Sequence, residues 1–307
     1  MALLEVKGIK KRFGKSEILK GIDFDLEKGE VLSIIGSSGS GKTTLLRCIN
    51  FLEFAENGTI TVNGEQIYNG ETDNKIKEKD LRQKRLHFGL VFQDFNLFPQ
   101  YNVLQNLTLA PSLLKMGTKE ELEAQARQII KKVGLEEKVD FYPSQLSGGQ
   151  KQLVFMAQAF VSRPRVLLLD EPTSALDLRH QLIVMQAARS YAKTTGAAVL
   201  AIVHDLMLAA RFSDKLLMLG DGTIRRFAAP AEVLTPEELA VVYRVEAAVE
   251  RSQEGLLTVI PMTPLDVDDG THGHGSHPHA HDPACTHSSS SDQHDHRIRH
   301  DDDHPHL

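Results

Sequence analysis

Residues 1–250 show a hydrophobic pattern that predicts strands alternating with helices. Near-continuous apolar runs, typical of strands buried on both faces of a parallel sheet, occupy residues 31–35, 166–169 and 198–203. Apolar residues that alternate with polar ones indicate strands with one exposed face, at residues 22–26 and 58–63. We therefore expect an α/β fold in which an antiparallel β subdomain lies beside a parallel core.

The pattern also predicts helices and turns. Between residues 43 and 52, apolar residues at helical spacing form one face: Leu45, Leu46, Ile49 and Leu52. Thr118 and Glu121 form a capping box before a second helix, which Gly134 closes. The dipeptide Asp221-Gly222 predicts a hairpin between two apolar strands.

Residues 266–307 differ from the rest of the chain, because they hold 11 of the 14 His and nine Asp with few apolar residues. Such a segment cannot bury enough apolar surface to offset its ordering entropy, so we expect a disordered tail. Imidazoles among carboxylates suit loose binding of Zn²⁺, Ni²⁺ or Cu²⁺, but the irregular spacing argues against a defined zinc site. Between metal buffering and a merely solvated low-complexity tail, we favour the latter.

The charge and the cysteines exclude several classes of protein. The whole chain has a net charge of −6, and the tail alone has −7, so residues 1–265 have a net charge of +1. A nearly neutral body lacks the excess of basic residues that is typical of proteins that bind nucleic acid. Two cysteines, Cys48 and Cys285, do not make a disulfide scaffold, and we expect Cys48 to be a core residue. No apolar run reaches the ~18 residues of a membrane-spanning helix, and Glu5 and Lys7 interrupt any signal peptide. We expect a cytoplasmic protein that meets a membrane only through a partner.

A phosphate-binding loop follows the first buried strand and precedes a predicted helix, which is the context that this motif requires. We expect it to bind nucleotide through Gly36, Ser37, Ser38, Gly39, Ser40, Gly41, Lys42, Thr43 and Thr44. Its glycines let backbone N–H groups turn toward phosphate oxygens, and the helix directs its positive end at them. Lys42 adds a charge beside the transferred phosphate, and the Thr43 hydroxyl is a ligand for Mg²⁺.

Two carboxylates, Asp170 and Glu171, stand at the end of the buried run 166–169. Beside a phosphate loop, this is where Asp170 would bind Mg²⁺. Glu171 would then orient and deprotonate an attacking water.

A second helix start of the anion-binding type lies at Leu146-Ser-Gly-Gly-Gln150. The chain thus has two phosphate-seeking helix starts but one phosphate-loop lysine. This suggests that the second, formed by Ser147, Gly148, Gly149 and Gln150, serves the nucleotide of another copy. The alternative is an ordinary Ser N-cap followed by flexible glycines, which is the favoured interpretation for Ser-Gly-Gly taken alone.

The ordered set of motifs resembles the ATP-binding subunit of an ABC transporter over residues 2–250. The set consists of Phe13, the phosphate loop 36–43, Gln93, the signature 146–150, Asp170-Glu171, Ser174-Ala-Leu-Asp177 and His204. The resemblance implies a P-loop NTPase (RecA-like) core with an antiparallel β subdomain and a small α-helical subdomain at about residues 95–161. It gives an ATP-binding domain at 1–250, a C-terminal extension at 251–265 and the His/Asp-rich tail at 266–307.

The resemblance also implies roles for single residues. Phe13 would stack on adenine, and Gln93 would touch Mg²⁺ or the attacking water and report to a membrane partner. Ser147 and Gly149 would bind the γ-phosphate held by the opposite subunit, where Asp177 would line the contact between subunits. His204 would contact the γ-phosphate and hold the geometry of Glu171.

The implied partners are a second ATP-binding subunit, transmembrane permease subunits and, indirectly, an extracytoplasmic substrate-binding protein. Two ATP molecules would be sandwiched between two copies, and hydrolysis would reopen the dimer. The protein would then lie peripherally on the cytoplasmic face of the cell membrane.

The two halves of the chain resemble importers of different substrates. Residues 2–146 are similar to polar amino acid importers, for example at Leu46-Arg-Cys-Ile-Asn50 and Val91-Phe-Gln-Asp-Phe-Asn-Leu-Phe-Pro99. Residues after 150, with Leu153 and Gln158, are more similar to importers of iron–siderophore, haem or cobalamin. We favour amino acids, because the amino-acid-like segment after Gln93 contacts the membrane subunit in the family.

Two other classes of NTPase compete with this assignment. A nickel or cobalt metallochaperone GTPase also combines a phosphate loop with His-rich segments, but Asn74-Lys75-Ile76-Lys77 lacks the final Asp of a guanine-reading motif. A soluble ABC-type ATPase of DNA repair would need a long coiled-coil insertion between Gln93 and Ser147, where only a small helical subdomain fits.

Overall fold

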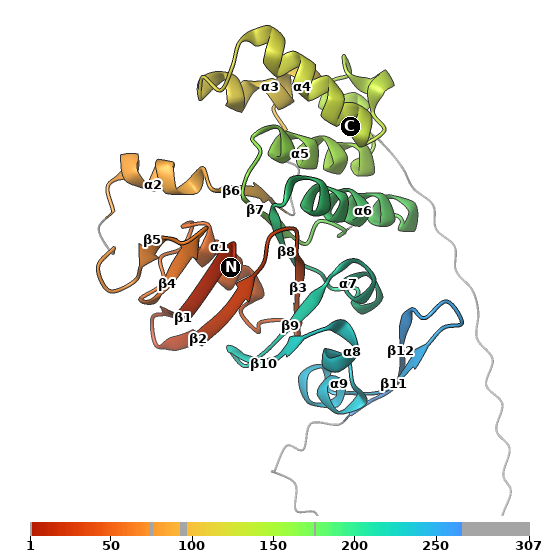
Figure 1. The fold of residues 1–307 in the computed structure, drawn as a ribbon. Coiled ribbons are helices and arrows are strands. Elements are labelled where there is room, and N and C mark those ends of the chain that lie inside the picture. The colour runs from red at the N-terminus through yellow and green to blue at the C-terminus, as the bar shows by residue number, and fades with distance from the viewer. Residues whose placement is uncertain (1, 74–75, 93–96, 175, 266–307) are drawn as a thin grey trace, which may run out of the picture. The chain divides into compact units, whose positions relative to one another are not determined.

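A six-stranded sheet with strand order β10-β9-β3-β8-β7-β6 lies at the centre of the fold (Figure 1). The structure, a computed structural model, describes residues 2–73, 76–92, 97–174 and 176–265. The pairs β9–β3, β3–β8, β8–β7 and β7–β6 are parallel, and β10 adds an antiparallel edge. The strands are β3 (Val31–Gly36), β6 (Phe88–Val91), β7 (Val166–Asp170), β8 (Ala198–Ile202), β9 (Lys215–Gly220) and β10 (Thr223–Ala228).

A second, antiparallel sheet packs beside α1 and confirms the predicted β subdomain. Its order is β2-β1-β4-β5, formed by β1 (Leu4–Phe13), β2 (Ser16–Leu26), β4 (Asn57–Val62) and β5 (Glu65–Asn69). Alternate residues of β2, among them Ile22 and Leu26, are buried, whereas their neighbours face solvent. The alternation of apolar and polar residues along β2 thus corresponds to a strand with one face packed against the core.

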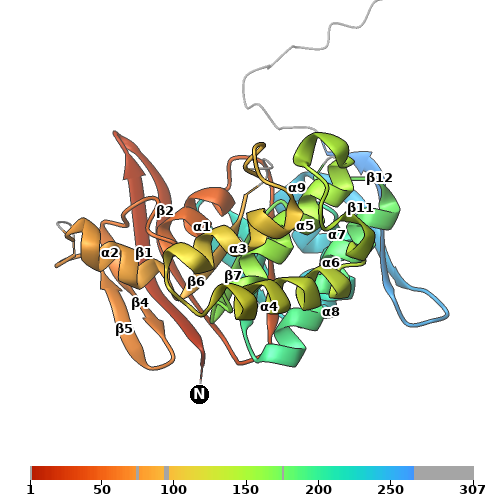
Figure 2. The same ribbon diagram turned by 90° about the horizontal axis from the view of Figure 1, so that it is seen from above.

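The helices cover the parallel sheet and extend beyond its β6 edge (Figures 1 and 2). Helices α3, α4 and α5 pack on one another as a helical layer. The helices are α1 (Lys42–Ile49), α2 (Glu78–Arg85), α3 (Val103–Leu113), α4 (Lys119–Lys132), α5 (Gly148–Val161), α6 (Leu178–Thr195), α7 (Leu206–Phe212), α8 (Pro230–Val233) and α9 (Pro236–Tyr243), with short 3₁₀ turns at Glu136–Lys138 and Pro143–Gln145. In the described part of the chain, no helix is long and apolar enough to cross a membrane.

A two-stranded hairpin, β11 (Val245–Arg251) and β12 (Leu257–Pro264), follows α9. The boundary predicted at residue 250 falls within this hairpin. Residues 266–307 lie outside the described residues, so the expected tail and the domain boundaries stay predictions.

Hydrophobic side chains form two clusters, one on each face of the parallel sheet. In β7, Leu167 and Leu169 belong to the cluster that includes the helical layer, whereas Val166 and Leu168 belong to the cluster beneath the antiparallel sheet. Because both faces are covered, the strand reads as an unbroken apolar run. Cys48 lies in the second cluster, as expected, and burial raises the pKa of its thiol to about 12.

The helix expected over residues 43–52 is shorter than predicted. Helix α1 ends at Ile49, and the N–H groups of Leu52 and Glu53 both donate to the Arg47 carbonyl. This turn gives Phe51 a φ of 57° and buries its ring, which is 1% exposed against 41% for Leu52. The assignment of Leu52 to the buried face was therefore wrong, because Phe51 packs there against the rings of Tyr68 and Phe88 instead.

Other local predictions are confirmed. The Thr118 hydroxyl accepts from the Glu121 N–H, and the Glu121 carboxylate accepts from the Thr118 N–H, which completes the capping box of α4. Gly134 has a φ of 71° just beyond that helix. The turn between β9 and β10 places Asp221 and Gly222 at φ 50° and 77°, as a tight hairpin requires.

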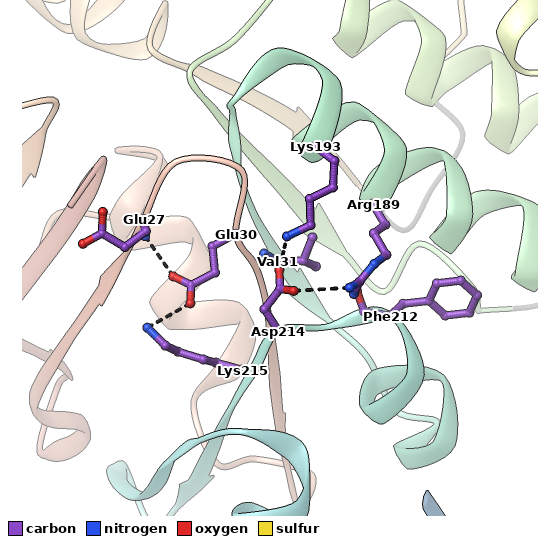
Figure 3. A network of polar contacts seen from close by, with 8 residues as sticks. All are labelled: Glu27, Glu30, Val31, Arg189, Lys193, Phe212, Asp214 and Lys215. Atoms are coloured by element: carbon purple, nitrogen blue, oxygen red, sulfur yellow. Dashed lines mark hydrogen bonds and ion pairs between the residues drawn. The ribbon is translucent and has the colours of Figure 1, made fainter. Parts of the chain in front are cut away.

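A polar network fastens the amino edge of the parallel sheet to α6 (Figure 3). The Asp214 carboxylate accepts from the Val31 N–H at 2.9 Å, from Lys193 at 2.9 Å and from Arg189 at 3.3 Å. Beside it, Glu30 accepts from the Glu27 N–H and pairs with Lys215 at 2.9 Å. One carboxylate thus holds both the start of β3 and the second half of α6.

We expect Asp214→Ala to lower the free energy of unfolding by about 1–3 kcal/mol, since it leaves two cations and a backbone N–H without this acceptor. Urea denaturation measures the loss. The matched control, Glu123→Ala, breaks the exposed pair with Lys119 on α4 and should cost less than about 0.5 kcal/mol. Equal losses in the two variants would contradict a structural role for the Asp214 network.

Candidate functional site

The carboxyl ends of three adjacent parallel strands meet at one place. Ile202 of β8 lies in register with Ile34 of β3 on one side and with Asp170 of β7 on the other. The segments that follow the three strands therefore leave the sheet at the same edge. This is where open α/β sheets bind ligands.

The predicted phosphate loop connects β3, which ends at Gly36, to α1, which begins at Lys42. The Lys42 side chain lies inside the loop, where its Nζ donates to the carbonyl oxygens of Gly36 and Ser37 at 2.8 Å each. Burial lowers the pKa of the Lys42 ammonium, and the nearby Glu171 carboxylate acts in the opposite direction. A cation is thus fixed at the centre of a ring of backbone groups.

Two positions of the loop, Gly36 and Gly41, have no room for a side chain. Gly36 and Gly41 have φ values of 145° and 100°, which L-residues with side chains rarely adopt. A Cβ at Gly36 would also collide with the Leu219 carbonyl of β9, and one at Gly41 would meet the Leu19 side chain of β2. The loop therefore fits between two strands only without side chains at these positions.

The Ser40 hydroxyl is buried and has no hydrogen-bond partner within the described residues. Buried polar groups are normally hydrogen-bonded, so this hydroxyl is available to a bound group. Its place inside the loop fits a ligand that brings anionic oxygens, such as a nucleotide phosphate.

Hard oxygen donors meet beside the loop. Asp170, the last residue of β7, is buried, and the Thr43 hydroxyl donates to its Oδ1 at 3.5 Å. Burial, followed by the adjacent Glu171 charge, raises the pKa of Asp170. Burial disfavours the charged form of this carboxyl, and a bound cation would offset that cost. The Asp170 carboxylate and the Thr43 hydroxyl are oxygen donors of the kind that fits a divalent cation such as Mg²⁺.

Glu171 directly follows β7 and has a φ of 50°, which is uncommon for a residue with a side chain. The N–H and the hydroxyl of Ser174 both donate to the Glu171 carbonyl and hold the turn. Its Oε1 lies 2.6 Å from Nε2 of His204, which follows β8. Strained backbone of this kind is concentrated at functional sites.

The signature motif opens α5, as predicted. Ser147 is the N-cap, with its hydroxyl accepting from the Gln150 N–H and the Gln150 amide oxygen accepting from the Ser147 N–H. A Cβ at Gly149 would collide with the ring of His180, whereas Gly148 has open space around it. His180 Nδ1 lies 2.8 Å from the Asp177 carboxylate, and the hydrogen bond from the His180 N–H lowers the pKa of Asp177.

One chain brings together only part of the predicted set. Lys42, Thr43, Asp170, Glu171 and His204 converge, but within the described residues no hydrogen bond or ion pair joins 147–150 to the phosphate loop. Phe13, at the end of β1, is 47% exposed, and the Lys11 ammonium lies over its ring at 4.8 Å from the centroid. Gln93 lies outside the described residues.

Tyr243 contacts the loop and was not among the predicted site residues. The hydroxyl of Tyr243, at the end of α9, accepts from the Gly36 N–H at 2.8 Å, and burial raises its pKa to about 12. A single tyrosine so far along the chain carries no motif, and only the packing of α9 reveals its contact.

Several known proteins are similar to this chain in sequence or in fold. The ABC transporter family model matches residues 19–174. The L-cystine transport system ATP-binding protein TcyN of Escherichia coli is 44% identical over 78% of this chain and 95% of its own length. The glutamine transport ATP-binding protein GlnQ of Bacillus subtilis is 41% identical over 75% of this chain and 92% of its own. Among solved structures, the ATP-binding cassette MJ0796, a dimer in a post-hydrolysis state with ADP and Pi, is similar with a TM-score of 0.65 and 30% identity, over 74% of this chain and 98% of its own.

We expect Gly149→Ala to lower the free energy of unfolding by about 1–3 kcal/mol, because the added methyl group meets the His180 ring. Gly148→Ala is the matched control, since its methyl group meets nothing, and it should leave the melting temperature unchanged or slightly raised. Thermal unfolding measures both variants. Adding His180→Ala should restore stability to Gly149→Ala, and failure of this rescue would show that the collision is not the cause.

Proposed function

We propose that this chain, which belongs to the family of ABC transporter ATP-binding subunits, powers the import of polar amino acids. The chain is an ATPase. The observation that carries the mechanism is the convergence of Lys42, Asp170, Glu171 and His204 at the carboxyl edge of the sheet. The amino acid assignment is supported by relatives named as transport proteins for glutamine, cystine and arginine.

The phosphate loop, residues 36–44, binds the phosphates of ATP in this proposal. Its backbone N–H groups and the start of α1 point toward anionic oxygens, and the Ser40 hydroxyl gains the partner that it lacks. Lys42 exchanges its carbonyl partners for phosphate oxygens, which favours the charged form that burial opposes. The exposed Phe13 ring is free to stack on adenine.

Thr43 and Asp170 hold the Mg²⁺ that accompanies ATP, with Gln93 as a further proposed ligand. Bound there, Mg²⁺ neutralises charge on the phosphate oxygens during transfer. The pKa of Asp170 is raised by burial, and ionisation of this carboxyl is therefore coupled to the arrival of a cation.

Glu171 acts as the general base that takes a proton from the attacking water. His204 is a positioning residue for it, since the 2.6 Å contact fixes the direction of the Glu171 carboxylate. The turn held by Ser174 keeps that carboxylate beside the loop rather than in solvent. His204 also reaches the γ-phosphate in this proposal.

A second copy of the chain completes each site. Ser147, Gly148, Gly149 and Gln150 of one copy bind the γ-phosphate held by the loop of the other, and Asp177 lines the contact between the copies. The support is that no hydrogen bond or ion pair among the described residues joins these four to the loop of their own chain, and that MJ0796 was solved as a dimer. ATP thus closes the dimer, and hydrolysis reopens it.

Transmembrane permease subunits dock on the segment that follows Gln93. Within it, large apolar side chains are exposed in and around α3: Phe98, Leu113, Leu114 and Met116. Exposed apolar side chains close together in the chain are typical of a surface that a partner covers. Through the permease, the chain lies on the cytoplasmic face of the membrane and responds to an extracytoplasmic substrate-binding protein.

Leu153 and Gln158, which are similar to residues of iron–siderophore importers, have a role in packing rather than in the choice of transported substrate. Leu153 is buried in the core, and the Gln158 amide donates to the Asn106 carbonyl of α3 at 3.1 Å. Both therefore pack within the helical layer, and Gln158 is half-buried there. The tail 266–307 stays, in this proposal, a solvated segment that binds metal only loosely.

Glu171→Gln should bind ATP but hydrolyse it about 10²–10⁴-fold more slowly, because the amide cannot accept the proton. In ATP and Mg²⁺ the variant should sediment as a dimer in analytical ultracentrifugation. Adding Ser147→Ala should weaken that dimer while ATP binding to the loop persists. Monomer alone at high protein concentration would contradict the two-copy site, and undiminished turnover would contradict the role of Glu171.

The ATPase rate of the chain, assembled with its permease subunits in liposomes, should rise when the binding protein carries glutamine, cystine or arginine. The same binding protein without ligand is the control. Stimulation by a ferric siderophore alone would replace amino acids by iron complexes as the substrate class and leave the ATPase mechanism intact.

A further inference from the structure

A large hollow lies at the amino edge of the parallel sheet, away from the nucleotide site. Its volume is about 840 Å³, and its walls come from α4, the end of α5 and the second half of α6. Arg165 and Ala197, which directly precede β7 and β8, line its inner end. Small-molecule sites are concave and typically of about 300–1,000 Å³, so the hollow has the size of a ligand pocket.

Among the described residues, the charged side chains that line the pocket itself are all cationic. Its lining contains four cationic residues and no Asp or Glu: Lys28, Lys132, Arg163 and Arg165. Within the described part of the chain, none of the four has an ion pair. A smaller hollow beside it shares Lys28 and Asn63 and is lined by Glu27, so one rim of the pocket borders on an acid.

Neighbouring cations at the same edge of the sheet are neutralised. Arg189 and Lys193 of α6 pair with Asp214, and Lys215 pairs with Glu30 (Figure 3). The cations of that network are thus held in ion pairs, whereas the described residues form no ion pair with the four cations of the pocket. Like charges gathered around a hollow repel one another, and an anion that enters it relieves the repulsion.

The remaining walls would suit an organic body with polar groups. Apolar and aromatic side chains form one part of the lining: Ile129, Val133, Phe160, Pro164 and Tyr191. Phe160 and Tyr191 are stacked with ring centroids 4.4 Å apart, which makes this part rigid. Amide and hydroxyl groups form another: Gln125, Gln128, Ser190, Thr194 and Thr195.

We propose that this pocket binds a small phosphorylated organic molecule. Two guanidinium and two ammonium side chains, all exposed to solvent, line the pocket. Both kinds of cation bind phosphate, and guanidinium does so in a bidentate manner. The apolar wall accounts for an organic body, and the concave shape favours a small molecule over a flat surface. The proposal does not depend on the transported substrate or on the roles proposed at the nucleotide site.

The pocket is separate from the nucleotide site because β7 and β8 run from one to the other. Arg165 precedes the first residue of β7, and Asp170 is its last. A ligand bound at the amino edge therefore cannot share a phosphate with Lys42, and substitutions in the two sites can be tested independently.

Isothermal titration calorimetry on the full chain tests the proposal with three probes: AMP, glucose 6-phosphate and inorganic pyrophosphate. At least one organic phosphate should bind with a dissociation constant of about 1 mM or lower, both in the unaltered chain and in Lys42→Ala. The Lys28→Gln, Lys132→Gln double variant should bind it about tenfold more weakly or worse. The single variant Lys132→Glu should weaken it at least as much and serves if the double variant is unstable.

The matched control is Lys131→Gln, which removes the neighbouring exposed charge on α4 but does not line the pocket. It should change affinity by less than about twofold. An equal loss in this control, loss of binding only in Lys42→Ala, or binding of pyrophosphate without either organic phosphate would overturn the proposal. An Asp-rich peptide that binds through Lys132 while no organic phosphate does would also overturn it, in favour of an acidic protein segment.

Discussion

The parallel pairing of β3, β8 and β7 is the constraint on which the rest of the site depends. Because Ile202 is in register with both Ile34 and Asp170, three segments far apart in sequence leave the sheet at one level. Without that register, the buried ammonium of Lys42 would not lie near the Glu171 carboxylate, nor Glu171 near His204. The positions of the site residues are thus set by the pairing of the strands that end at the site.

The site itself is not a source of stability. It contains a buried lysine, a buried carboxyl whose pKa is raised, an unpaired serine hydroxyl and a glutamate in the left-handed region. Each of these features is unfavourable in isolation. They persist because two hydrophobic clusters cover both faces of the strands that carry them. The same groups are those that phosphate, a cation or a water would satisfy.

The sequence predicted the elements that obey local rules. Strands buried on both faces, the capping box of α4 and the hairpin at Asp221 each depend on residues close together in the chain, and all three are as expected. The positions of Lys42, Asp170 and Glu171 followed from motif and strand order, whereas Gln93 is not described. Predictions were less successful where packing between distant segments decides, as for Phe51, whose burial over Leu52 depends on Tyr68 and Phe88. Tyr243 and the amino-edge pocket likewise arise from contacts that no local pattern encodes.

The contact between Gly149 and His180 couples two stretches of sequence that would otherwise vary independently. The His180 ring lies against Gly149, and His180 is also hydrogen-bonded to Asp177, so the first turn of α5 packs on the first turn of α6. The need for glycine at position 149 therefore depends on which residue occupies position 180. A chain in which a smaller residue replaced His180 would be released from that need.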